Sequence, residues 1–121
     1  MNFKKMKLSW AGRAFRLEFP PERPVLYAIP VMERYIQVDI NQFEFDALVS
    51  FICHMGEEIF AKSTILKCLN KDERFGASNM FEWEGRLHGG ESIRKKEGSL
   101  FRGTHYLCDI PKKDQKEIPE V

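Results

Sequence analysis

The feature that most constrains the fold is a change of sequence period at Asn41. Asn41 and Glu44, three residues apart, form the capping-box pattern that starts helices. Apolar residues then recur at helical spacing, at Phe45, Leu48, Val49 and Ile52. Gly56 suits the left-handed end of a helix. The pattern therefore predicts a helix from about Asn41 to Met55.

The residues before Asn41 have a β-type composition. In "AFRLEF" the apolar residues Phe15, Leu17 and Phe19 alternate with charged ones, the period of a half-buried strand. Prolines in "PPERP" require a loop before "VLYAI" and "YIQVDI". Residues 1–40 are therefore predicted to form a small antiparallel sheet of three or four strands.

Two further helices are predicted after Gly56. The first covers Lys62 to Leu69, and "NKDERFGAS" then reads as a charged loop. The next begins near Ser78 or Asn79 and continues to about Leu87, where "HGG" ends it. "SIRKKEGSLF" and "HYLCDI" are predicted as extended segments of a β-hairpin around "RGT". The predicted core includes Phe45, Leu48, Ile52, Leu66, Met80, Trp83, Leu87, Phe101 and Tyr106.

Composition bounds the organisation of the chain. With 121 residues it is expected to form one domain over 1–110, followed by a flexible charged tail over 111–121. The net charge of +1 gives no overall case for nucleic acid, but residues 62–113 hold 11 basic against 7 acidic residues. Three widely spaced cysteines favour buried thiols in a reducing compartment. With neither a secretory signal nor a long apolar run, we expect a cytoplasmic protein without a membrane partner.

Enzymatic and metal sites find little support. Cys53 and His54 are adjacent on a helix, so their side chains diverge. His105 and Cys108 face opposite sides of a predicted strand, which argues against a shared metal. A zinc site from the three cysteines and a histidine would need tertiary proximity that the sequence does not predict. We therefore expect no enzymatic activity, no cofactor and no metal.

Three stretches carry a resemblance to a known family. "NQFEFDALVSFI", "EEIFAKSTILKCL" and "FRGTHYL" resemble, in order and spacing, the first helix, second helix and wing of the winged helix-turn-helix domain of OmpR/PhoB-type and ToxR-like regulators. The resemblance implies an α+β fold with an N-terminal antiparallel sheet over 1–40, and with a three-helix core and a C-terminal β-hairpin wing over 41–110.

The resemblance also implies a DNA-binding transcription regulator. Its recognition helix, at about 78–88, would enter the major groove, and Arg102 at the wing tip would enter the minor groove. The implied partners are double-stranded DNA, RNA polymerase or a partner regulator, and a second copy in a homodimer. The candidate DNA contacts are Lys62, Ser63, Thr64, Ser78, Asn79, Glu82, Arg86, His88, Arg94, Lys95, Lys96, Arg102 and Thr104.

A second hypothesis rests on the acidic character of the third predicted helix. Glu82 and Glu84 would repel phosphate, and Phe81 beside them would suit the groove of a protein partner. The winged helix would then be a protein-interaction module that no longer binds DNA. For Ser63, helix capping is the alternative to phosphate binding, and for Arg102 it is a local salt bridge or exposure to water.

Overall fold

The computed structural model describes residues 2–119, and every regular element in that range is helical. The expected α+β fold is therefore wrong, since neither the N-terminal sheet nor the wing is present among the described residues. The elements in chain order are η1 Phe3–Lys5, α1 Trp10–Glu18, α2 Val25–Tyr35, α3 Gln42–Met55, α4 Glu57–Ala61, α5 Thr64–Asn70, α6 Arg74–His88, α7 Glu91–Arg102, η2 Tyr106–Asp109 and η3 Lys112–Asp114.

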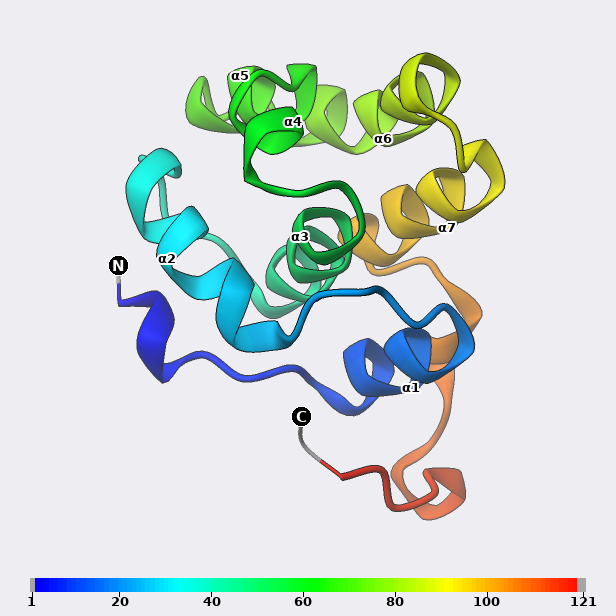
Figure 1. Cartoon of the computed structure of the whole chain (residues 1–121). Helices are drawn as coiled ribbons and strands as arrows, with labels where there is room; N and C mark the ends of the chain where they lie inside the picture. The colour runs from blue at the N-terminus through cyan, green and yellow to red at the C-terminus, as the bar shows by residue number, and fades with distance from the viewer. Residues whose placement is uncertain (1, 120–121) are drawn as a thin grey trace.

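Helix α3 is the central element, and the other helices surround it (Figure 1). Its predicted start is confirmed: the Asn41 side chain accepts from the Glu44 N–H at 2.9 Å, and Glu44 Oε1 accepts from the Asn41 N–H at 2.9 Å. Its predicted end is confirmed at Gly56, which has a φ of 90°. Every residue from Glu44 to Cys53 is buried, as expected for a helix covered on all sides.

Helix α1 replaces the strand predicted from alternation in "AFRLEF". Ser9 accepts a hydrogen bond from the Gly12 N–H at 3.2 Å and so caps the helix. Ser9 is itself anchored to α3, because Asp46 accepts from both its backbone N–H and its hydroxyl. Phe15 is fully buried whereas Leu17 is 65% exposed, so the apparent alternation has no structural role. The strand predicted at "VLYAI" is the first half of α2.

Helices α5 and α6 differ in how well the sequence predicted them. The helix predicted over Lys62 to Leu69 is α5, capped by Ser63. Helix α6 begins at Arg74, inside the predicted loop, and ends before Gly89. Its predicted inner face is wrong: Trp83 is 44% and Leu87 56% exposed. The buried residues are instead Ala77, Ser78, Phe81, Glu84 and Gly85.

The predicted wing is occupied by α7. This helix runs antiparallel to α6 after the turn at Gly89 and Gly90, and it packs between α6 and α3 (Figure 1). Arg102 is its last helical residue, and Gly103, with a φ of 75°, caps its C-terminus. Tyr106, expected in the core, is 58% exposed. The segment "RGT" is therefore a helix end rather than a hairpin tip.

The N-terminal segment, α1 and the C-terminal tail gather on one side of α3, opposite α5 and α6 (Figure 1). The tail is tied to α1, because Trp10 Nε1 donates to the carbonyl of Lys116 at 2.5 Å. The three cysteines are free, with Cys53 buried and the other two partly buried. Within residues 2–119, no helix is both long enough and apolar enough to span a membrane.

Candidate functional site

The residues predicted to bind phosphate at the start of α5 stabilise the helix instead. The hydroxyl of Ser63 is buried and accepts from the Leu66 N–H at 3.1 Å. The hydroxyl of Thr64 donates to Glu84 at 2.7 Å. Lys62 is exposed and pairs with Glu58 at 3.3 Å. The capping alternative for Ser63 is confirmed.

The predicted recognition-helix residues are divided between the interior and two faces of α6. Ser78 is buried and Asn79 is exposed. Arg86 pairs with Glu82 at 3.3 Å and with Glu91 at 3.0 Å, so an acidic residue lies on each side of its guanidinium. The imidazole of His88 lies 3.4 Å from Glu84. Helix α6 thus presents no continuous basic face.

The predicted wing residues are also dispersed. Arg94 is buried, whereas Lys95 is exposed. Lys96 Nζ lies 4.9 Å from the centroid of the Phe19 ring. Arg102 donates to the Ser78 hydroxyl at 3.2 Å, a hydrogen bond between α7 and α6. Thr104 donates to the carbonyl of Ser99 at 3.3 Å. The expected DNA surface is not formed by these residues.

A buried polar cluster between α3 and α7 contains Ser50, His54, Arg94 and Glu97. Glu97 accepts from Arg94 Nε at 2.5 Å, from Arg94 Nη2 at 2.9 Å and from the Ser50 hydroxyl at 2.5 Å. His54 Nδ1 lies 2.8 Å from the carbonyl of Ser50, which can only accept, so this nitrogen carries a proton. The imidazole therefore cannot take a proton from the Ser50 hydroxyl through Nδ1. The cluster stabilises the α3–α7 contact and is not a nucleophile and base pair.

The other interior carboxylates have equally local partners. Glu44 accepts from Arg74 at 2.6 Å in addition to its capping bond. Asp46 anchors Ser9, and burial raises its pKa against the opposing effect of those hydrogen bonds. Glu84 accepts from Thr64. No group of three or more metal-ligating side chains occurs within the described part of the chain.

One pocket brings two exposed carboxylates together. It has a volume of about 310 Å³ and lies where α2 leads into α3. Glu33 of α2 and Asp39 of the following connection line it, and Phe3 of η1 forms part of its wall. The lining is mostly polar. The composition of "YIQVDI", which includes Asp39, had suggested a strand, so nothing in the sequence indicated that the two carboxylates would share a pocket.

The comparisons with known proteins agree with this helical architecture. The family model for phage lysozyme matches residues 25–98, from the first residue of α2 into α7. The chain belongs to the phage lysozyme family. The endolysin of Bacillus phage B103 is similar to it, with 35% identity over 75 residues. That match covers 58% of this chain and 28% of the endolysin, so the chain spans little more than a quarter of its relative.

A solved structure shows the same fold. A mutant of P22 lysozyme is similar with a TM-score of 0.67 and 18% sequence identity, covering 80% of this chain and 99% of the P22 chain. The all-helical arrangement around α3 is therefore a lysozyme-like fold.

The family overturns the functional expectations drawn from the sequence. The resemblance to OmpR/PhoB-type regulators is wrong, because residues 25–98 match the phage lysozyme family and the fold is lysozyme-like. DNA binding and the winged-helix interaction module are both wrong with it. Phe81, which the second hypothesis required on the surface, is fully buried. The expected partners, which were double-stranded DNA, RNA polymerase or a partner regulator, are wrong for a chain of this family. The expectation of no enzymatic activity is wrong for the same reason.

Proposed function

We propose that this chain acts in the hydrolysis of bacterial cell-wall peptidoglycan, as a lysozyme of the phage type. The observation that carries the proposal is the family match over residues 25–98, which includes α2 to α6 and most of α7. The similarity to an endolysin and the shared fold with P22 lysozyme support it.

Hydrolysis of a glycosidic bond requires particular reacting groups, and these limit which residues of this chain are candidates. Most glycosidases use two carboxyl groups on either side of the scissile bond, about 5–9.5 Å apart. The buried carboxylates Glu44, Asp46, Glu84 and Glu97 are unsuited to this role, because each is held inside the fold by hydrogen bonds. Glu33 and Asp39 are exposed and line one pocket, so we propose them as the first pair to test.

The experiment measures hydrolysis and wall binding separately. Purified peptidoglycan is incubated with the chain, soluble sugar fragments are quantified by mass spectrometry, and bound protein is measured after sedimentation. Glu33→Gln and Asp39→Asn should each reduce fragment release by about 100-fold or more, the usual scale for a lost acid or base. Glu58→Gln is the matched control, because Glu58 is also an exposed carboxylate, at 84%, but does not line this pocket. Its ion-pair partner is Lys62, the residue that follows α4.

The outcomes separate three cases. Loss of hydrolysis in both pocket variants, with Glu58→Gln unaffected, supports the proposal and the pair. Hydrolysis that persists in both variants supports lysozyme activity but excludes Glu33 and Asp39 as the reacting groups. Binding without any fragment release contradicts hydrolysis by this chain and leaves it a wall-binding role.

A further inference from the structure

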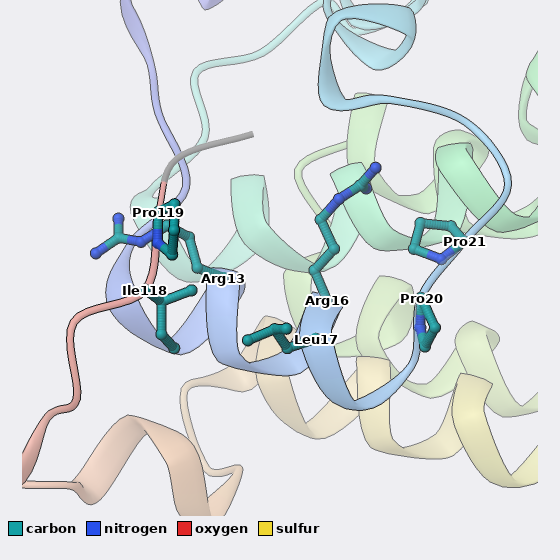
Figure 2. Close-up of a pocket in the computed structure, with 7 residues that line it drawn as sticks. All are labelled: Arg13, Arg16, Leu17, Pro20, Pro21, Ile118 and Pro119. Atoms are coloured by element: carbon teal, nitrogen blue, oxygen red, sulfur yellow. The ribbon is translucent and has the colours of Figure 1, made fainter.

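A second pocket lies outside the segment that matches the phage lysozyme family. It has a volume of about 380 Å³ and is formed by α1, the loop that follows it and the C-terminal tail (Figure 2). Its lining residues, all outside 25–98, are Arg13, Arg16, Leu17, Pro20, Pro21, Ile118 and Pro119. The walls are mostly apolar. This pocket is therefore a feature that the family match does not account for.

Arg13 lines both this pocket and another one. The other pocket, of about 310 Å³, is formed by the N-terminal segment and the start of α2. Arg13 Nη1 donates to the carbonyl of Leu8 at 2.8 Å, but its Nε is shielded from solvent and has no hydrogen-bond partner within residues 2–119. Leaving a buried cationic N–H without a hydrogen-bond partner costs free energy. An acceptor atom from a bound ligand would therefore be stabilising at this position.

The lining of the other pocket is both cationic and apolar. Its cations are Lys4, Lys7 and Arg13, and its apolar residues are Met6, Leu8, Val25, Leu26 and Ile29. No acidic residue is among the described residues that line either pocket. The tail residues 111–119, which contribute Ile118 and Pro119 to the first pocket, hold three lysines against two acidic residues, and positions 1–19 hold five Lys or Arg against one acidic residue. That one, Glu18, accepts a hydrogen bond from Tyr106.

Two of the residues that line these pockets are exposed leucines. Leu17 on α1 is 65% exposed and Leu26 in the first turn of α2 is 80% exposed. Exposed leucines beside cationic side chains are typical of surfaces that lie on anionic membranes, where the leucines enter the acyl region and the cations contact phosphate. Lysine and arginine suit this position because their aliphatic stems also cover apolar surface.

We propose that this face, formed by Lys4, Lys7, Arg13, Leu17 and Leu26 and called here the α1 face, docks on a bilayer that contains anionic phospholipid. The cations would bind lipid phosphates, and Arg13 could do so from either pocket because it lines both. The leucines would anchor the chain in the acyl region. This proposal is independent of the proposed hydrolysis, because Glu33 and Asp39 line neither of its pockets.

The test is sedimentation of the full chain with vesicles. Vesicles of phosphatidylglycerol and phosphatidylethanolamine should bind the protein, vesicles of phosphatidylcholine should not, and added salt should weaken binding. Leu17→Ser and Leu26→Ser should each lower the partition coefficient by about tenfold, as loss of an inserted leucine predicts. Lys4→Glu with Lys7→Glu should lower it by at least about fivefold for each charge removed.

Matched controls lie on the opposite side of the molecule. Phe75→Ser and Leu87→Ser remove apolar residues that are 73% and 56% exposed, and Lys67→Glu with Lys71→Glu reverses two exposed cations. The proposal is supported if these variants bind as the wild type does while the α1-face variants do not. Equal binding to neutral vesicles, no vesicle binding, or equal losses in control and α1-face variants would overturn it. Circular dichroism verifies that each variant is folded.

Discussion

At the scale of single residues, the most sensitive contact is the buried ion pair between Arg94 and Glu97. Both side chains are almost fully shielded, at 3% and 0% exposed, and Glu97 uses both oxygens. Bringing such a pair inside the protein adds little net stability, but removing one partner leaves the other charge buried without compensation. Removing either partner would therefore leave an unpaired charge buried in the contact between α7 and α3.

Glu97→Gln is expected to lower the free energy of unfolding by about 3–5 kcal/mol, because Arg94 would remain buried and charged. Ser50→Ala, which removes only the hydroxyl bonded to Glu97, should cost about 1 kcal/mol. Urea denaturation measures both. Adding Arg94→Met to Glu97→Gln should recover part of the loss. Similar costs for Glu97→Gln and Ser50→Ala would contradict this account.

At the scale of helices, the sequence was informative where ends are marked by local chemistry. The capping box at Asn41, the Ser63 cap and the glycines after α3 and α6 were all recognised from their residue types. Helix α7 was missed because its buried face contains Arg94, Glu97 and Gly98, so its hydrophobic pattern does not show the inward side. Helix α6 was assigned the wrong face for the same reason, since Glu84 and Gly85 are buried while Trp83 and Leu87 are exposed.

Close contact between α6 and α7 depends on Gly98. A Cβ at this position would lie 2.7 Å from the backbone carbonyl oxygen of Ser78, which cannot move without shifting α6. Gly98→Ala is therefore expected to reduce stability by about 1–3 kcal/mol despite the better helix propensity of alanine. Gly76→Ala in α6 is the control: its Cβ would meet nothing closer than Cys68 Sγ at 3.7 Å, so it should gain up to about 1 kcal/mol. Thermal unfolding of both variants measures the difference, and a stabilising Gly98→Ala would show that the two helices separate easily.

At the scale of the whole molecule, the pocket beside α1 and the pocket between α2 and α3 could not be predicted from the sequence. The pocket beside α1 joins residues 13–21 to residues 118 and 119, which are about 100 positions apart and are brought together by the tail. Glu33 and Asp39 line the same pocket because α2 ends between them. Such proximity follows from the packing of helices around α3, and the predicted sheet and wing placed these segments elsewhere.

The global stability should depend on pH through two buried groups with opposite effects. Burial raises the pKa of Asp46 above its ordinary 3.8, so the folded state holds this proton more tightly than the unfolded chain. The stability that Asp46 contributes is therefore complete below about pH 3.8 and is lost as the pH rises through its folded pKa. Near neutral pH its charge is a cost, which the hydrogen bonds from Ser9 and Gln42 reduce.

His105 acts in the other direction and at higher pH. Burial lowers its pKa below 6.5, with Lys96 adding to the shift and Glu18 opposing it. The unfolded chain takes up this proton first, so the contribution of His105 is present above about pH 6.5 and is lost as the pH falls through the folded pKa. Lowering the pH from about 7.5 to about 5.5 should therefore reduce the free energy of unfolding of the wild type. His105→Asn should flatten this dependence, because an amide oxygen can still accept from the Leu107 N–H but does not titrate. Urea denaturation across this pH range decides the matter: parallel curves for the two proteins would mean that His105 is not the group whose protonation destabilises the fold.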